Sequence, residues 1–307
     1  MGEEKSAWSN YWRGRTAGAS GEVFGEVGIE RSEELAEFWS SYFAGVRSGR
    51  ILDLACGAGS ALKHVPAGHG GILVGADISA DAIEQALSNV SAMVGVVSSA
   101  DALPFADGSF DFIVSQFGFE YADAKRAAAE VARVLAPGGV FTSVSHMADG
   151  AIAAECRRHL DTIESIEGSG FVEASKTLFS AVSDRESGRG HIDQVATDEA
   201  LSAFKVANAA MLALRTDNPL AAHLHSGASQ LYDRRANYAL ADIHGWLDAM
   251  AAEIAAYRLR MQGMINAALT REKAEQIIAI ISPGGAGSVE PFELRGKAAA
   301  YVLRGPA

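Results

Sequence analysis

One short stretch of this chain combines a buried-type strand, an acidic side chain and two closely spaced glycines. It reads Asp53-Leu54-Ala55-Cys56-Gly57-Ala58-Gly59. Glycines allow a tight turn and let backbone N–H groups approach a ligand closely. In a nicotinamide-binding turn a third glycine would stand where this chain has Leu62, which weakens that interpretation without excluding it.

The position of Asp53, on the strand just before this turn, favours a particular ligand charge. A carboxylate there would repel a pyrophosphate and attract an ammonium or sulfonium group. The sequence therefore favours a cationic ligand at the turn. The alternative is that Asp53 only accepts hydrogen bonds from backbone N–H groups of its own loop.

Two further acidic residues follow the next two predicted strands. Asp77 could accept two hydrogen bonds from a ribose diol, or it could be the N-cap of a helix that begins near Ala80. Asp101 could accept from an adenine amine while the Ala102 N–H faces a ring nitrogen, or its carboxylate could cap a turn. If the ligand roles hold, the ligand is an adenine nucleoside.

These residues require a framework in which strands end at one common edge. Alternating strands and helices predict a parallel, doubly wound α/β sheet, whose ligands bind outside the carboxyl ends of the strands. The expected strands are 51–55, 71–76, 94–98, 110–115 and 140–145. Helices are expected at 80–90 and 125–135, the second closed by Pro137-Gly138-Gly139. The glycine turn should also enter a helix.

The rest of the chain divides into three further parts. Residues 1–47 are expected to be an N-terminal segment, with Trp8, Tyr11, Trp12 and Phe24 packed on the core or forming a flap, and with a helix over 31–47 that starts near Ser32. Residues 151–281 show helical patterns and almost no strand signal, and include a long helix over 234–269. Strands at 290–294 and 299–303 predict a terminal hairpin, so that 48–150 and 282–307 make one domain.

Composition narrows the class of partner. The chain of 307 residues carries 26 basic and 38 acidic residues, a net charge of −12. Nucleic-acid binding normally needs a basic face, so nucleic acids and anionic membranes are not expected partners. No apolar run approaches the length of a membrane span, and the N-terminus does not read as a secretory signal. Two cysteines give no disulfide framework, and a cytoplasmic location is the simplest expectation.

Taken together, these motifs resemble the class I S-adenosylmethionine-dependent methyltransferases, in particular the small-molecule group that includes the ubiquinone and menaquinone methyltransferases. The likeness rests on Ile51 to Gly59, on Gly75-Ala76-Asp77-Ile78-Ser79, on the stretch from Ala100 to Asp111 and on Glu130 to Gly139. It covers roughly residues 45–146 and returns at 290–304. The long helical insertion departs from the family pattern.

The resemblance implies a Rossmann-like sheet of seven mostly parallel strands with a terminal antiparallel hairpin. It implies S-adenosyl-L-methionine as cofactor and S-adenosyl-L-homocysteine as product. Residues at matching positions would bind the cofactor: Asp53, Ala55, Gly57 and Gly59 around the amino acid end, Asp77 and Ile78 at the ribose, Asp101 and Ala102 at the adenine, and Gln116 and Phe117 along the methionine portion.

The expected reaction is methyl transfer to a small molecule, by oxygen, nitrogen or carbon methylation. Positioning and desolvation can supply most of the catalysis, with a base where the acceptor must lose a proton. His146 is the first candidate base, although a plain loop histidine fits the same position. Glu120 and Tyr121 could position substrate or simply pack at a helix start. A non-catalytic S-adenosylmethionine-binding scaffold and a nicotinamide oxidoreductase are the competing functions.

No metal site is expected. His191, His223, His225 and His244 lie in the insertion without a carboxylate or cysteine at ligand spacing. Cys56 reads as a small packing residue. The insertion could cover the active site, or its long apolar stripe could form a homodimer, although such a stripe is usually ordinary core.

Overall fold

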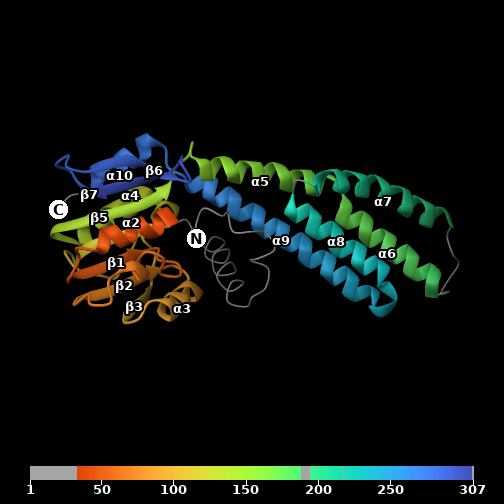
Figure 1. Cartoon of the computed structure of the whole chain (residues 1–307), viewed down its shortest axis with the longest axis horizontal. Coiled ribbons are helices and arrows are strands. Elements are labelled where there is room, and N and C mark those ends of the chain that lie inside the picture. Colours follow the sequence, from red (N-terminus) through yellow and green to blue (C-terminus); the bar gives the residue numbers. More distant parts are fainter. Residues whose placement is uncertain (1–32, 188–193, 217, 306–307) are drawn as a thin grey trace. The chain divides into compact units, whose positions relative to one another are not determined.

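The computed structural model describes residues 33–187, 194–216 and 218–305, and divides the chain into two compact units. One unit contains residues 33–156 and 263–305, and the other residues 157–262 (Figure 1). The aromatic segment before residue 31, the helix start at Ser32 and His191 all lie outside the described residues. None of the helices within the described ranges is long and apolar enough to cross a membrane.

The first unit is built on one seven-stranded sheet. Its strand order is β3-β2-β1-β4-β5-β7-β6, with β7 antiparallel to both of its neighbours and the other pairs parallel. This arrangement confirms the expected Rossmann-like sheet with a terminal hairpin. The strands are β1 (Arg50–Leu54), β2 (Ile72–Asp77), β3 (Met93–Val97), β4 (Phe110–Gln116), β5 (Leu135–His146), β6 (Ser288–Leu294) and β7 (Lys297–Gly305).

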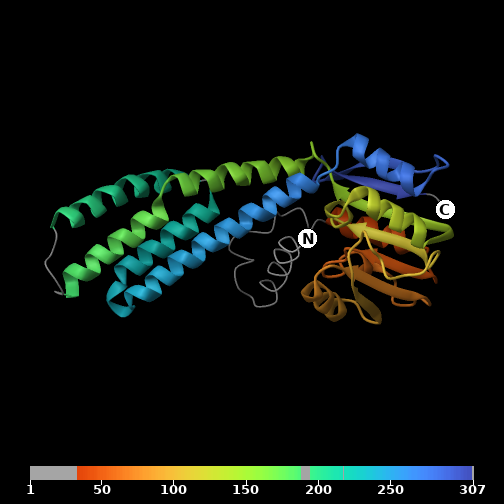
Figure 2. The ribbon, with the colours of Figure 1, turned by 180° about the vertical axis from the view of Figure 1, so that it is seen from behind.

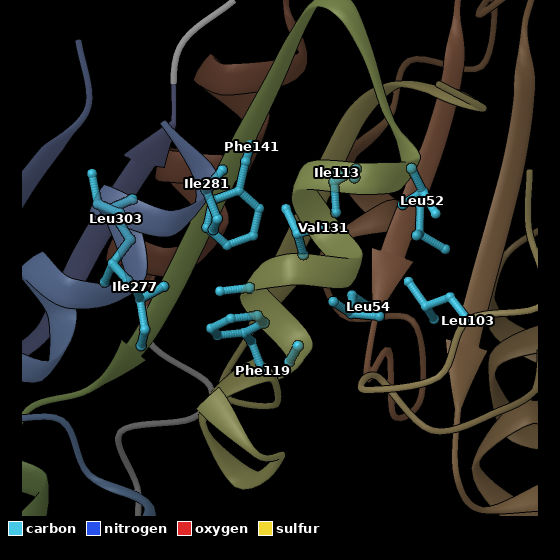
Figure 3. Packing of buried hydrophobic residues seen from close by; sticks show 14 of the residues in the cluster. Leu52, Leu54, Leu103, Ile113, Phe119, Val131, Phe141, Ile277, Ile281 and Leu303 are labelled. Atoms are coloured by element: carbon cyan, nitrogen blue, oxygen red, sulfur yellow. The ribbon is translucent and has the colours of Figure 1, made fainter. Parts of the chain in front are cut away.

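Helices α4 (Ala124–Val134) and α10 (Arg271–Ile281) pack against each other on one face of the sheet (Figure 2). Every second residue of the strands points to that face. These side chains form one apolar cluster with the buried residues of α4 and α10. Figure 3 shows Leu54 and Ile113 from the strands with Val131 from α4 and Ile277 from α10 in this core. Burial of this set holds the carboxyl ends of β1 and β4 in fixed positions.

The opposite face is covered by α2 (Glu33–Phe43) and α3 (Ala80–Asn89). Trp39 of α2 and Ile83 of α3 are buried there, and Ile83 lies so close to Gly95 that an added Cβ would come within 2.5 Å of it. Asp53 alternates with Leu52 and Leu54 along β1, so its side chain belongs to this second face.

The helix expected over 125–135 ends within one residue of its predicted end, but the Pro-Gly-Gly motif does not close it. Helix α4 stops at Val134, and β5 begins at once with Leu135 paired to Phe110. Pro137 to Gly139 instead lie inside β5, where the register with β4 shifts. Gly138 adopts a positive φ of 77°, which allows the irregular backbone at this point of β5.

The second unit is helical. It contains α6 (Phe171–Ser187), α7 (Gln194–Leu214) and α8 (Pro219–Asp233), in which α6 packs on α7 and α7 on α8. The boundaries between the units fall inside α5 (Ala151–Gly168) and α9 (Leu240–Ala267). The apolar stripe of α9 is buried within the chain at Ile243, Leu247, Met250, Ile254, Tyr257 and Met261. Because these side chains are already buried inside the chain, a homodimer would have to form through a different surface.

The unit boundaries differ from the division expected at residues 151 and 281. Helix α10 was placed in the insertion, but it packs on α4 and on the β6–β7 hairpin. Its buried residues Ala274, Ile277 and Ile281 belong to the same apolar cluster as the strands. An amphipathic helix looks the same in sequence whichever unit it joins, which is why the pattern placed it wrongly.

Candidate active site

The turn after β1 holds three residues in the left-handed backbone region. The φ angles are 53° at Ala55, 52° at Gly57 and 79° at Gly59. An added Cβ at Gly59 would lie 2.7 Å from a methyl group of Val90, so this position has no room for a larger residue. Strain at the non-glycine Ala55 is a feature that clusters at ligand sites.

No long helix follows this turn, contrary to the expectation from the sequence. Leu62–His64 form a single 3₁₀ turn, and Leu62 is buried in the core. A dinucleotide-binding turn places its pyrophosphate on the N-terminus of an α-helix. That source of positive field is lacking among the described residues 55–71, which weakens the nicotinamide interpretation further.

The Asp53 carboxyl is almost fully buried, at 1% exposed. The backbone of Leu62 donates one hydrogen bond to it, while Oδ2 has no partner among the described residues. Burial, and then the charge of Asp77, raise the pKa of Asp53 well above its usual range. A buried carboxylate oxygen without a donor is costly and suits a cationic or N–H-bearing ligand. The alternative, in which Asp53 only accepts hydrogen bonds from its own loop, therefore explains one of its two carboxyl oxygens.

Asp77 ends β2 and links the glycine turn to the next loop. Its Oδ2 accepts the Gly57 N–H at 2.9 Å, and its Oδ1 accepts the Ser79 N–H at 2.9 Å. Burial raises the pKa of Asp77 despite these bonds. The N-cap of α3 is Ser79, whose hydroxyl accepts from Ala82, so the N-cap alternative for Asp77 is wrong. Ile78 is half-buried beside it.

A carboxylate can accept about four hydrogen bonds, and the backbone N–H groups of Gly57, Ile78 and Ser79 supply three to Asp77. The carboxyl therefore fixes the turn and can still accept from a ligand.

The loop after β3 carries Asp101. Its Oδ1 accepts the Ser99 hydroxyl at 2.6 Å, and its Oδ2 lies 3.5 Å from the Arg126 guanidinium. The Ala102 N–H donates to the Ser99 carbonyl at 3.2 Å, so it is already engaged and is not held open for a ring nitrogen. Asp101 thus bonds the side chains of Ser99 and Arg126 while remaining partly exposed.

Hydrogen bonds from helix α4 hold this loop in place. Nothing in the sequence indicated them. Glu130 accepts the Leu103 N–H at 2.7 Å, and Arg133 donates to the carbonyls of Leu103 and Phe105. Arg133 also pairs with Glu130 at 2.7 Å. These residues lie in the Glu130 to Gly139 stretch of the family likeness, but their contacts are about 30 positions away in sequence.

The end of β4 is tied to the glycine turn. The Ser115 hydroxyl donates to the Leu54 carbonyl at 2.7 Å and accepts the Phe119 N–H at 3.0 Å. An added Cβ at Gly118 would meet the Ala55 carbonyl oxygen at 2.5 Å. The β4 loop and the glycine turn are therefore in contact, as ligand residues from two strands should be.

Gln116 and Phe117 lie in this loop. The Trp39 indole N–H donates to Gln116 Oε1 at 2.7 Å, which orients the amide. Phe117 has a positive φ of 52°, and its ring lies 4.4 Å from the His146 imidazole. The sequence had no signal for the Trp39 contact beyond an apolar helical stripe.

The three candidate catalytic residues come together. His146 ends β5, and its Nδ1 lies 2.7 Å from Glu120 Oε1, which also accepts the His146 backbone N–H at 2.7 Å. Both side chains are buried. The Tyr121 ring meets the imidazole edge-on, with ring centroids 5.9 Å apart. His146 Nε2 has no partner among the described residues. A carboxylate on Nδ1 places the free lone pair on Nε2, the arrangement of a histidine base with an orienting acid.

Two of the histidines in the insertion have hydrogen-bond partners among the described residues. His225 contacts Asn208 at 3.1 Å and Arg215 at 3.3 Å, and His244 contacts Ser180. Within the described ranges no three metal-ligating side chains cluster. Burial raises the pKa of the Cys56 thiol, which argues against its use as a nucleophile.

Comparison with known proteins agrees with this geometry. Residues 52–143 match the family described as a methyltransferase domain. The chain is similar to the demethylmenaquinone methyltransferase of Thermus thermophilus, with 43% identity over 96 residues, which are 29% of this chain and 44% of that protein. It is also similar to the mitochondrial arginine-hydroxylase NDUFAF5 of Mus musculus, with 31% identity over 134 residues, covering 43% and 38%.

A solved methyltransferase of Haloferax volcanii, in complex with the activator Trm112, aligns over 47% of this chain and 61% of its own, with 26% identity and a TM-score of 0.38. The chain spans less than half the length of the two curated relatives. The matched residues include the turn at Asp53 to Gly59 and the carboxylates Asp77 and Asp101. The family match therefore shows that residues 52–143 are similar to a methyltransferase domain.

Proposed function

We propose that this chain transfers a methyl group from S-adenosylmethionine to a small-molecule acceptor, with His146 as base and Glu120 as the residue that orients it. The observation that carries the cofactor assignment is Asp53, a buried carboxyl with an oxygen that lacks a partner among the described residues. An ammonium group of the cofactor would satisfy that oxygen and compensate the charge.

The remaining residues fit the same cofactor. Asp77 would accept a ribose hydroxyl with its remaining lone pair, and the partly exposed Asp101 would accept from the adenine amine. Gln116, oriented by Trp39, would lie along the methionine portion together with Phe117. When bound, the cofactor supplies a methyl group activated by the positive charge on its sulfur.

The base assignment follows from the hydrogen bonds of the dyad. Glu120 holds the Nδ1 side of the ring, so Nε2 can accept the proton that leaves an acceptor hydroxyl or amine. The same carboxylate then stabilises the imidazolium. Burial of both side chains keeps water away from this pair, which strengthens their interaction.

Formation of S-adenosylhomocysteine across a panel of small hydroxyl- and amine-bearing metabolites, followed by mass spectrometry, tests the proposal. We expect turnover with at least one acceptor, and its loss in H146N with cofactor binding intact. Tight cofactor binding with no turnover for any acceptor would favour a non-catalytic binding protein. Turnover unchanged in H146N would remove the base assignment and leave the methyltransferase.

A further inference from the structure

A cavity of about 290 Å³ lies in the sheet unit between α4 and α10. Its lining shares only Glu120 with the residues assigned above to cofactor and catalysis. The other side chains used here are Lys125, Lys273, Leu269, Ile277 and Ile280. This volume is at the small end for ligand sites, so it suits a ligand about the size of one ring.

Glu120 connects this cavity to the dyad. Its Oε1 holds His146, but its Oε2 is buried and has no hydrogen-bond partner among the described residues. The residue is 5% exposed and its side chain 0%, so the carboxyl is shielded from water. A buried acceptor at a cavity wall calls for a ligand that donates a hydrogen bond.

Two lysines give the cavity its charge. Across the described residues, neither Lys125 nor Lys273 takes part in an ion pair. The nearest acids along each helix have other partners: Asp123 accepts the Arg126 N–H, and Glu272 accepts from the Gln276 amide. In a chain of net charge −12, two uncompensated lysines on one small cavity are suited to an anion.

Leu269, Ile277 and Ile280 supply apolar wall between these polar groups. We propose that this cavity binds a small organic acid that carries a hydroxyl group, its acid group bound by Lys125 and Lys273 and its hydroxyl donating to Glu120. Because Glu120 also holds His146, the ligand contacts the orienting half of the dyad. The binding itself does not depend on methyl transfer.

Calorimetry of the whole chain with 4-hydroxybenzoate, in the absence of S-adenosylmethionine, tests the site. Benzoate lacks the donor and 4-hydroxybenzamide lacks the charge, so both should bind at least three-fold more weakly. K125Q and K273Q should each weaken binding of 4-hydroxybenzoate about three- to ten-fold. K297Q changes an exposed lysine of the same unit and should leave binding unchanged.

The variant E120Q separates recognition of the donor from recognition of charge. Its amide should reduce the preference for 4-hydroxybenzoate over benzoate while the effect of K125Q remains. Absence of binding by 4-hydroxybenzoate at millimolar concentration would overturn the proposal. Binding that K125Q and K273Q weaken no more than K297Q does would also overturn it. Because the readout is binding without cofactor, its outcome is separate from that of the methyl-transfer test.

Discussion

Glu120 Oε1 accepts two hydrogen bonds from His146, one from the backbone N–H at 2.7 Å and one at the ring Nδ1 at 2.7 Å. The two residues are 26 positions apart: His146 ends β5, and Glu120 lies in the 3₁₀ turn Phe119–Tyr121 that follows β4. The backbone bond fixes the carboxylate beside His146, and the bond at Nδ1 then orients the ring, so Nε2 keeps one direction. This relationship turns two separate candidates into one functional unit.

The dyad predicts distinct effects of two substitutions. H146N should lower kcat by about 10²- to 10⁴-fold, since it removes the base. E120Q keeps a carbonyl oxygen that can accept both hydrogen bonds, so the fold should persist while kcat falls less than in H146N. Steady-state rates of the wild type and both variants give the check.

The matched control is Y121F, which keeps the ring that contacts the imidazole. It should retain most of the activity. Equal rates for H146N and the wild-type protein would show that no base acts at this position.

Asp53 predicts a trade-off between stability and binding. Its pKa is raised in the folded state, so the folded protein holds that proton more tightly than the unfolded chain does. Stability is therefore greatest below the ordinary carboxyl range and is lost as pH rises through the raised pKa. D53N removes the charge and should make the ligand-free protein melt at a higher temperature at neutral pH than the wild type.

The same substitution should weaken S-adenosylmethionine about ten-fold or more, as expected for loss of a charge-assisted hydrogen bond. Thermal melts from pH 4 to 8 and calorimetry measure the two effects. D111N, at an exposed carboxylate paired with Arg50, is the control and should change neither quantity much. A D53N protein that binds the cofactor normally would refute the role of Asp53.

Substitution of Asp77 should lower the free energy of unfolding. D77A leaves the N–H groups of Gly57 and Ser79 without their acceptor, which should cost about 2 kcal/mol or more of unfolding free energy. D77N keeps one acceptor oxygen and should cost less. Denaturant unfolding and cofactor titration of both variants separate the effects. Undiminished cofactor binding by D77N and D77A would refute the ribose assignment.

Trp39 is predicted to act through Gln116. W39F removes the indole donor and should lower the affinity for the cofactor, with a loss of stability of about 1–3 kcal/mol from the reduced volume. F43L is a matched control, because Phe43 is buried in the same aromatic cluster and stacks on Trp39. A double-mutant cycle between W39F and Q116A should show coupling. Additive effects would make Trp39 a packing residue only.

Except for the start of β5, which lies at Leu135 rather than Val140, the strands could be predicted to within two residues, because their apolar runs are bounded by glycines and acids. The three candidate acids were also visible, because Asp53 and Asp77 lie near the ends of β1 and β2 and Asp101 lies in the loop after β3. The length of the helix after the glycine turn could not be predicted. The residue type at Leu62 fits a single helical turn as well as a helix of several turns. The sequence likewise predicts the wrong unit for helix α10, because an apolar helix face does not show which element it packs against.

Contacts between distant residues could not be predicted from one sequence. The Trp39–Gln116 bond joins residues 77 positions apart, and Ser115 reaches Leu54 over 61 positions. The engagement of the Ala102 N–H by the Ser99 carbonyl depends on loop geometry that residue types do not fix. Such details decide which groups a ligand can still reach.

Calorimetry of the full chain with S-adenosylmethionine, S-adenosylhomocysteine and NADH tests the central claim most directly. The turn at Asp53 to Gly59 lacks a following α-helix and presents a buried carboxyl, so the first two ligands should bind and NADH should not. D53N should weaken S-adenosylmethionine. Preferential binding of NADH, or binding of neither adenosyl ligand, would contradict the account.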